Sequence, residues 1–386
     1  MGNNPIKRTI SEVFEEMAQA IETGMIGKKT RVGLTIIGSE HGPQELVRGA
    51  ELAMEQNPDL EVVIIGDGGA TSLEIVSAGD EKEAQAVMEE MLAQGGLDAA
   101  VTMHYNFPIG VSTVGRVITP SKGKSMFVAT TTGIAATERV TAMLRNTVYG
   151  IAAAKACQIP NPTVGILNID GARQVERALQ KLKEGGYPIN FAESLRADGG
   201  IIMRGNDLLI GVPDIMVMDS LTGNLIMKVF SASGTGGNYE ASGWGYGPGV
   251  GEDYDRIIGI VSRASGAPVI AGALKYAADC AKGNLPARIK AEWAAVKAAG
   301  WDKLLESLSC PALPMKRAEE AVPPAKKPVT ESLPGVEVIE LEDAVQVLWK
   351  ANIYAECGMG CTGPIVMIAP EDKEKAFGLL KEKGYL

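Results

Sequence analysis

From residue 31 to residue 310 the chain alternates short apolar runs with amphipathic segments, and this alternation most constrains its fold. Apolar runs such as Val32–Ile37 have the length of buried strands. Segments such as Gln44–Glu55 carry apolar residues at helical spacing. Because a helix between two strands lets them pair in parallel, we expect an α/β domain with an open, mostly parallel sheet and flanking helices.

The predicted strands are Val32–Ile37, Glu61–Gly66, Leu97–Met103, Met126–Thr132, Val164–Ile169, Ile189–Glu193, Pro213–Asp219 and Ile257–Val261. The predicted helices are Gln44–Glu55, Glu81–Gln94, Ala142–Ala156, Arg173–Lys183, Leu225–Phe230, Gly272–Ala281 and Arg288–Leu308. Loops that follow the carboxyl ends of such strands are where open sheets bind ligands, so we look there for a site.

Three further segments surround this domain. Residues 1–30 predict a helical arm, because apolar residues recur at helical spacing between residues 5 and 27. Residues 311–335 contain six prolines among charges and alanines, which is typical of a semi-rigid linker. Residues 336–386 then predict a small α/β module, in the order strand, helix, cysteine loop, strand and helix.

The cysteine loop spans Glu356–Pro364 and holds Cys357 and Cys361 among three glycines and a proline. This composition predicts an irregular loop, in which backbone N–H groups can lower a thiol pKa and stabilise an oxyanion. Two inert thiols, a metal site and a nucleophilic or redox thiol are the three interpretations. A structural zinc site needs a second ligand pair, which the chain does not offer, so we expect no metal.

Two other stretches suggest a binding site. Ser220, Thr222 and Asn224 surround the predicted start of a helix, where they either bind an anion or simply cap the helix. The glycine-rich stretch 233–251 predicts either a mobile lid over a site or a tight structural loop. His41, after the first strand, is either an acid–base group or a polar loop residue.

Composition excludes several classes of protein. A net charge of −10 and a pI near 5.0 argue against nucleic acid and anionic membranes as partners. No apolar run reaches the roughly 18 residues of a membrane span, and residues 1–30 show no signal pattern. Five scattered cysteines favour the reducing cytoplasm, and two histidines leave little room for Ser-His-Asp chemistry.

Several motifs resemble the phosphate acyltransferases of phospholipid synthesis. They are Gly38–Pro43 with its following helix, Asn161–Ile169, and Pro213–Asn224 with its Asp-Ser-Leu-Thr-Gly-Asn end. The glycine-rich opening is shorter than in that family, and the cysteine module is extra. With that module, nearly the whole chain is similar to the alpha subunits of protein C of glycine/sarcosine/betaine reductase complexes.

This resemblance implies a subunit that accepts an acetyl group as a cysteine thioester and transfers it to phosphate, giving acetyl phosphate. It implies Cys361 as the carrier, with Cys357 second, and a phosphate site formed by Asp219, Ser220, Thr222, Gly223, Asn224, Ser39 and His41. The implied partners are the beta subunit of protein C and a selenoprotein A that carries a carboxymethyl group. Phosphate is the co-substrate, and no cofactor is expected.

Two other functions remain open from the sequence. An acyl-carrier-protein:phosphate acyltransferase would need no thiol, and it would accept long acyl chains. A non-catalytic scaffold subunit would bind its partner without phosphorolysis of its own.

Overall fold

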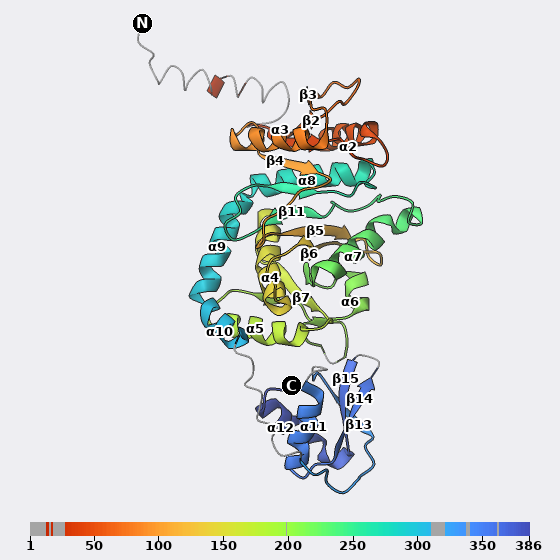
Figure 1. The fold of residues 1–386 in the computed structure, drawn as a ribbon, viewed down its shortest axis with the longest axis vertical. Helices are drawn as coiled ribbons and strands as arrows, with labels where there is room; N and C mark the ends of the chain where they lie inside the picture. The colour runs from red at the N-terminus through yellow and green to blue at the C-terminus, as the bar shows by residue number, and fades with distance from the viewer. Residues whose placement is uncertain are drawn as a thin grey trace. The chain divides into compact units, whose positions relative to one another are not determined.

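The computed structural model describes residues 13, 14, 17, 28–197, 199–309, 321–336, 340–360 and 363–386. The chain forms two compact units (Figure 1). The first comprises Met1–Asn168 and Leu179–Gly300, and the second comprises Ile169–Ala178 and Trp301–Leu386. Of the predicted N-terminal arm, Val13, Phe14 and Met17 are helical and exposed, and residues 1–12, 15, 16 and 18–27 lie outside the described residues.

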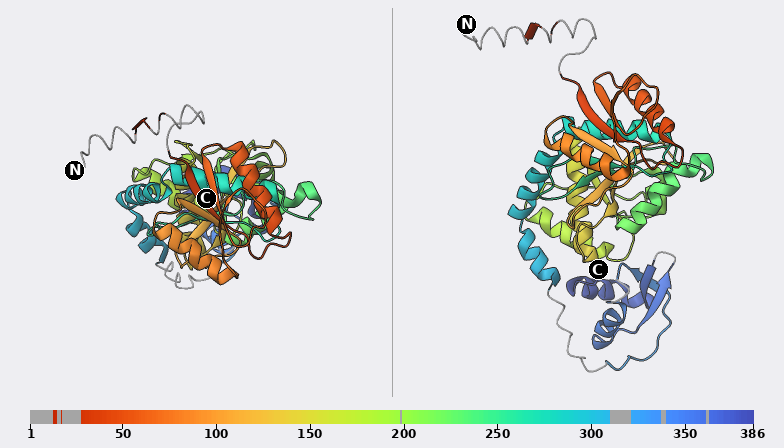
Figure 2. Two further views of the ribbon diagram at one scale, coloured as in Figure 1. Left: turned by 90° about the horizontal axis from the view of Figure 1, so that it is seen from above. Right: turned by 45° about the horizontal axis from the view of Figure 1, so that its top comes forward.

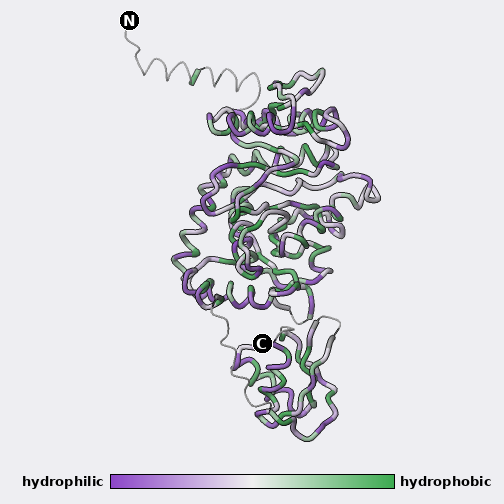
Figure 3. Tube along the Cα trace, viewed as in Figure 1, coloured by the Kyte–Doolittle hydropathy of each residue, from purple (hydrophilic) through white to green (hydrophobic). Residues whose placement is uncertain are grey.

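A twelve-stranded sheet forms the centre of the first unit. Its strands are β1 (Thr30–Thr35), β2 (Leu60–Ile65), β3 (Glu74–Val76), β4 (Ala99–Thr102), β5 (Ser112–Ile118), β6 (Ser125–Gly133), β7 (Thr163–Leu167), β8 (Asn190–Phe191), β9 (Ile202–Met203), β10 (Ile215–Val217), β11 (Gly247–Val250) and β12 (Ile258–Ile260). The order is β3-β2-β1-β4-β12-β11-β5-β6-β10-β7-β8, and β9 also pairs with β7. Hydrophobic residues gather along these strands (Figure 3).

The sheet is mostly parallel, as predicted, but three pairs in its middle are antiparallel. These are β12 with β11, β11 with β5, and β5 with β6. Three reversals in succession leave β6, β10 and β7 running opposite to β1, β4 and β12. The sheet therefore contains two parallel halves of opposite direction.

The helices of the first unit are α2 (Pro43–Gln56), α3 (Glu81–Ala93), α4 (Arg139–Ala156), α6 (Gly205–Ile210), α7 (Ser220–Ala232), α8 (Ala267–Lys282) and α9 (Leu285–Ala298). Helix α5 (Ala172–Glu184) contributes residues to both units. Helices α7 and α9 lie on opposite sides of the first unit (Figures 1 and 2). α4 is buried on nearly every side, so its apolar residues need no amphipathic pattern.

Two helix predictions differ from the structure. α7 begins at Ser220, five residues before the predicted start, because Asp219 caps it. The predicted helix Arg288–Leu308 is two helices, α9 and α10 (Trp301–Ser309). Gly300, whose φ of 100° suits glycine, separates them.

Of the two interpretations of residues 233–251, the tight structural loop fits the part from Glu240 to Val250. The end of this stretch, Gly247–Val250, is β11, an interior strand buried between β12 and β5. Its middle is tied down as well, since Glu240 forms an isolated bridge with Ser265. Gly247 allows close packing of this strand, because a Cβ there would lie 1.7 Å from the backbone oxygen of Val114.

In the second unit, a three-stranded antiparallel sheet in the order β13-β15-β14 packs with two helices. The strands are β13 (Glu331–Pro334), β14 (Ala355–Gly360) and β15 (Gly363–Ile368), and the helices are α11 (Leu341–Lys350) and α12 (Lys373–Glu382). Their shared core includes Leu348, Val366, Ile368 and Leu380.

Two predictions for this unit need correction. β13 falls inside the predicted linker 311–335, so the folded module begins earlier than residue 336. The described residues of the predicted irregular cysteine loop are paired strand residues, with Cys357 in β14 opposite Val366. Glycine disfavours strands, but pairing with the apolar β15 outweighs that local preference. Residue 310, residues 311–320 of the linker and residues 337–339 lie outside the described residues.

Candidate active site

A pocket of about 580 Å³ lies where the two halves of the large sheet meet. Residues that follow β4 and β12 form one wall, and the end of β6 with the first half of α7 forms another. The carboxyl ends of strands from both parallel halves thus converge on one pocket, which is where open sheets bind ligands. Its polar lining residues are His104, Asn106, Thr132, Asn224, Lys228 and Ser262, and its apolar ones include Phe107, Ile109 and Ile134.

The predicted anion turn at the start of α7 is a capped helix end. The Asp219 carboxylate accepts the backbone N–H of Thr222 at 3.0 Å and its hydroxyl at 2.9 Å. A carboxylate in this place occupies the helix N–H and repels a second anion. Asp219, Ser220 and Thr222 are also absent from the residues that line the pocket. The interpretation of these residues as a simple cap is therefore the better one.

Gly223 and Asn224 have a different role from the cap residues. A Cβ on Gly223 would lie 1.7 Å from the backbone oxygen of Thr130, so glycine is required for α7 to approach β6 this closely. One step on, the Asn224 side chain donates to the backbone oxygen of Thr131 at 3.2 Å. Asn224 also lines the pocket, and it is the member of the predicted segment that reaches it.

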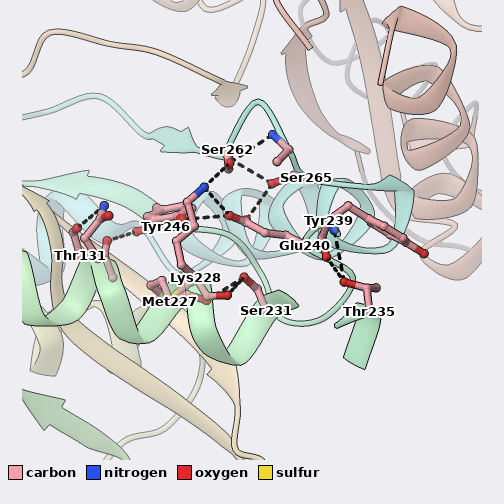
Figure 4. A network of polar contacts seen from close by, with 12 residues as sticks. Thr131, Met227, Lys228, Ser231, Thr235, Tyr239, Glu240, Tyr246, Ser262 and Ser265 are labelled. Carbon is pink, nitrogen blue, oxygen red and sulfur yellow. Dashed lines mark hydrogen bonds and ion pairs between the residues drawn. The ribbon is translucent and has the colours of Figure 1, made fainter. Parts of the chain in front are cut away.

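Lys228 is a site residue that sequence reasoning missed. Its ammonium lies 3.1 Å from Glu240 Oε1 and 3.0 Å from Ser262 Oγ (Figure 4). Lys228 lines the pocket, whereas Glu240 stands behind it and is only 1% exposed. Its spacing in the sequence could have indicated this role, because residues four apart, such as Asn224 and Lys228, lie on one face of a helix.

Two further donors hold the Glu240 carboxylate. The Tyr246 hydroxyl donates to Oε1 at 3.0 Å, and Ser265 donates to Oε2 at 3.1 Å. Burial, together with the neighbouring carboxylate, raises the pKa of Tyr246 far above its usual range, so this hydroxyl stays a donor at neutral pH. Glu240 is thus a buried carboxylate with a complete set of partners.

Ser39 and His41 lie in the loop after β1 and do not line the pocket. The His41 N–H donates to Ser39 Oγ at 3.1 Å, a local turn. The His41 ring packs edge-on against Tyr239 at 5.8 Å between centroids. The other histidine, His104, does lie in the pocket wall. Asn224 and His104 therefore both line the pocket, whereas Ser39 and His41 do not.

The described cysteines differ sharply in environment. The Cys357 thiol contacts the backbone oxygen of Leu341 at 3.8 Å. Cys357 is exposed, yet partial desolvation and the nearby Glu342 carboxylate raise the pKa of its thiol, which disfavours the nucleophilic thiolate. Cys280 is fully buried, and its pKa is raised strongly by burial. Cys361 lies outside the described residues.

In the described parts of the chain, no three His, Cys, Asp or Glu side chains gather in a way that could hold a metal ion. Among the same residues, no helix has the length and apolarity needed to cross a bilayer.

Comparisons with known proteins show which proteins this chain is similar to. Residues 30–367 match the family model described as fatty acid synthesis protein. The chain is 57% identical over 379 residues to the glycine/sarcosine/betaine reductase complex component C subunit alpha of Peptoclostridium acidaminophilum, covering 98% of each chain. It is 24% identical over 245 residues to a phosphate acyltransferase of Geobacillus, covering 53% of this chain and 71% of that one.

Among solved structures, a branched-chain phosphotransacylase from Enterococcus faecalis aligns with a TM-score of 0.48 and 14% identity, covering 65% of this chain and 99% of that one. The match to the family model and the identity to the reductase subunit extend over most of the sequence. The chain therefore belongs to the fatty acid synthesis protein family and, within it, to the alpha subunits of component C of glycine/sarcosine/betaine reductase complexes.

Proposed function

We propose that this chain accepts an acetyl group as a thioester on Cys361 and transfers it to inorganic phosphate, giving acetyl phosphate. The proposed partners are a selenoprotein A that carries a carboxymethyl group and the beta subunit of protein C. Phosphate enters as co-substrate, and no resident cofactor takes part in the transfer step. The observation that carries the proposal is the pocket shared by Asn224 and Lys228, in a chain related to phosphate acyltransferases.

The transfer step is a phosphorolysis. A phosphate oxygen attacks the thioester carbonyl, forming a C–O bond and a tetrahedral oxyanion. The C–S bond then breaks, and the sulfur leaves as a thiolate that takes up the proton released by phosphate. Donors aimed at the oxyanion and at the phosphate oxygens would stabilise this sequence.

The pocket offers donors suited to phosphate. Lys228 and Asn224 supply an ammonium and an amide from α7, and Ser262 supplies a hydroxyl from the wall that follows β12. An ammonium is a strong ligand for a phosphate dianion because the hydrogen bond is charge-assisted. The pocket is walled by apolar residues such as Phe107, which lowers the local dielectric and strengthens these interactions.

The choice of Cys361 over Cys357 follows from the environment of Cys357. A thiol in a regular strand, with its pKa raised by burial and by Glu342, is a poor nucleophile and a poor leaving group. Cys361 directly follows the last residue of β14. The acetyl carrier and the pocket belong to different units, so turnover requires the thioester to reach bound phosphate.

The test is arsenate-dependent breakdown of acetyl phosphate by the purified chain, since arsenate replaces phosphate and its acyl ester hydrolyses. We expect Cys361→Ser to abolish this activity and Cys357→Ser to retain it. Alkylation with N-ethylmaleimide should inactivate the chain in step with labelling of Cys361, mapped by mass spectrometry. Full activity in Cys361→Ser would overturn the choice of carrier.

A second function is favoured by one observation, the size of the pocket. A volume of about 580 Å³ exceeds what acetyl phosphate alone fills, and the exposed Ile109 and Ile134 line it. An acyl-carrier-protein:phosphate acyltransferase would use this space for a long chain. Turnover of long acyl thioesters that survives alkylation of all thiols would establish it. A scaffold subunit, in contrast, would show no arsenolysis at all.

A further inference from the structure

The Lys228 ammonium stands between a buried carboxylate and the pocket. Behind it, Glu240 Oε1 lies 3.1 Å away in a site where that side chain is only 2% exposed. In front of it, the Lys228 side chain is 51% exposed and lines the pocket. Lys228 is the one lysine or arginine among the described residues that line this pocket. The positive charge that would face a bound anion is therefore that of Lys228, which already forms an ion pair with Glu240 on its other side.

Glu240 cannot move away when an anion binds. Its backbone N–H donates to Ala264 at 3.0 Å, and its backbone oxygen accepts from Gly266 at 2.9 Å. Its side chain is held by Tyr246 and Ser265 as well as by Lys228 (Figure 4). The negative charge is thus fixed close to the phosphate site, where solvent does not screen it.

We propose that Glu240 sets the phosphate affinity of the pocket, weakening the hold of Lys228 on anions so that phosphate binds reversibly and acetyl phosphate leaves. This inference rests on the proposed function. An anion on the far side of the ammonium would lie about 6 Å from the carboxylate, given hydrogen bonds of about 3 Å on each side. At that distance, repulsion of a dianion offsets much of the attraction by Lys228.

A second effect of Glu240 has the opposite sign. By fixing the Lys228 side chain, Glu240 lowers the entropy that the lysine loses when it binds an anion. Glu240→Gln separates the two effects. The amide oxygen can still accept from Lys228 and Tyr246, and the amide nitrogen can donate to Ser265, so position is kept while the negative charge is removed.

The experiment is calorimetric titration of the full chain with inorganic phosphate, beside the arsenolysis assay. We expect Glu240→Gln to bind phosphate about tenfold more tightly or better, with a lower KM for arsenate and a lower kcat, because release of the anionic product becomes slower. Affinity that is unchanged or weaker in Glu240→Gln would overturn the inference.

A matched control exists elsewhere in the first unit. Lys155 pairs with the buried Glu292 at 2.5 Å, and the Tyr187 hydroxyl donates to Glu292 at 2.8 Å. This Lys–Glu–Tyr arrangement does not line the candidate pocket. Glu292→Gln should therefore cost similar stability and leave phosphate affinity unchanged. A tenfold tightening in this control as well would assign the effect to net charge and overturn a specific role for Glu240.

The wild-type chain provides a measurement that needs no variant. Because Glu240 offsets the charge of Lys228, salt has little net attraction to screen. We therefore expect phosphate affinity to change less than about threefold while ionic strength rises from about 0.01 to 0.15 M and the Debye length falls from about 30 to 8 Å. A change of about tenfold or more would overturn the inference even if Glu240→Gln failed to fold. A wild-type chain that binds no phosphate at all would instead overturn the proposed function.

Discussion

The Asp219 carboxylate accepts both the backbone N–H and the hydroxyl of Thr222, at 3.0 and 2.9 Å. This pair closes the N-terminus of α7, and the same helix directs Asn224 and Lys228 to the pocket one and two turns later. Asp219 and Thr222, which suggested an anion-binding turn, therefore hold the start of α7 in place. The hydrogen-bond donors that line the pocket, Asn224 and Lys228, lie further along the same helix.

Asp219→Ala should destabilise the first unit by about 1 kcal/mol, the usual cost of losing an N-cap, without loss of phosphate binding. Asp219→Asn is the control, because asparagine caps equally well and should be nearly neutral. Urea unfolding and phosphate titration of the two variants test this. If both variants lost phosphate binding while remaining folded, Asp219 would belong to the anion site after all.

Gly223→Ala should be far more damaging than a typical glycine substitution. The new methyl group would overlap the backbone oxygen of Thr130, so α7 must move away from β6, at a cost of about 3 kcal/mol. We expect a lower unfolding midpoint together with weaker phosphate binding, because Asn224 moves with the helix. Gly234→Ala is the matched control, since nothing lies within 4 Å of its Cβ. Equal stability of the two variants would contradict the close approach.

Cys357 should react slowly with alkylating reagents at neutral pH. Burial first, and Glu342 second, raise the pKa of this thiol, so the thiolate fraction at pH 7 is lower than for an ordinary cysteine. The labelling rate of Cys357 in a Cys361→Ser background should rise steeply only at alkaline pH. Glu342→Gln should shift that rise modestly toward neutrality. A pH profile equal to that of free cysteine would refute this description of the thiol.

Asp214 should contribute stability that is lost in acid. Burial alone would raise its pKa, but hydrogen bonds from the Thr163 N–H and hydroxyl, and the Lys124 ammonium, lower the pKa below its usual value. Because the pKa is lower in the folded state, this stabilisation is present above about pH 3.9 and disappears as pH falls through the folded pKa.

Asp214→Asn should therefore cost about 1–2 kcal/mol of unfolding free energy at pH 7 and much less near pH 3. Urea unfolding of wild type and variant at both pH values gives the comparison. A difference that stayed constant with pH would show that the lost contribution does not depend on ionisation of Asp214.

Local sequence patterns predicted much of the fold. Apolar runs such as Leu60–Ile65 need burial on both faces, and helices such as α2 show the spacing of an amphipathic surface, so these elements follow from periodicity alone. Asn224 was also within reach, because its segment resembles a family motif and does line the pocket. The strand that contains Cys357 could not be predicted, because Gly358 and Gly360 locally disfavour a strand.

Periodicity along the chain was enough to predict a mostly parallel sheet of alternating strands and helices, with a small cysteine-bearing module after it. The reversal of half the sheet at β11 and β5, and the pocket lined by residues after β4, β12 and β6, are evident only in the folded chain. The same holds for the position of Glu240 behind Lys228. Pairing between distant strands and the pairing of a buried charge depend on long-range contacts, which leave no periodic signal in the chain.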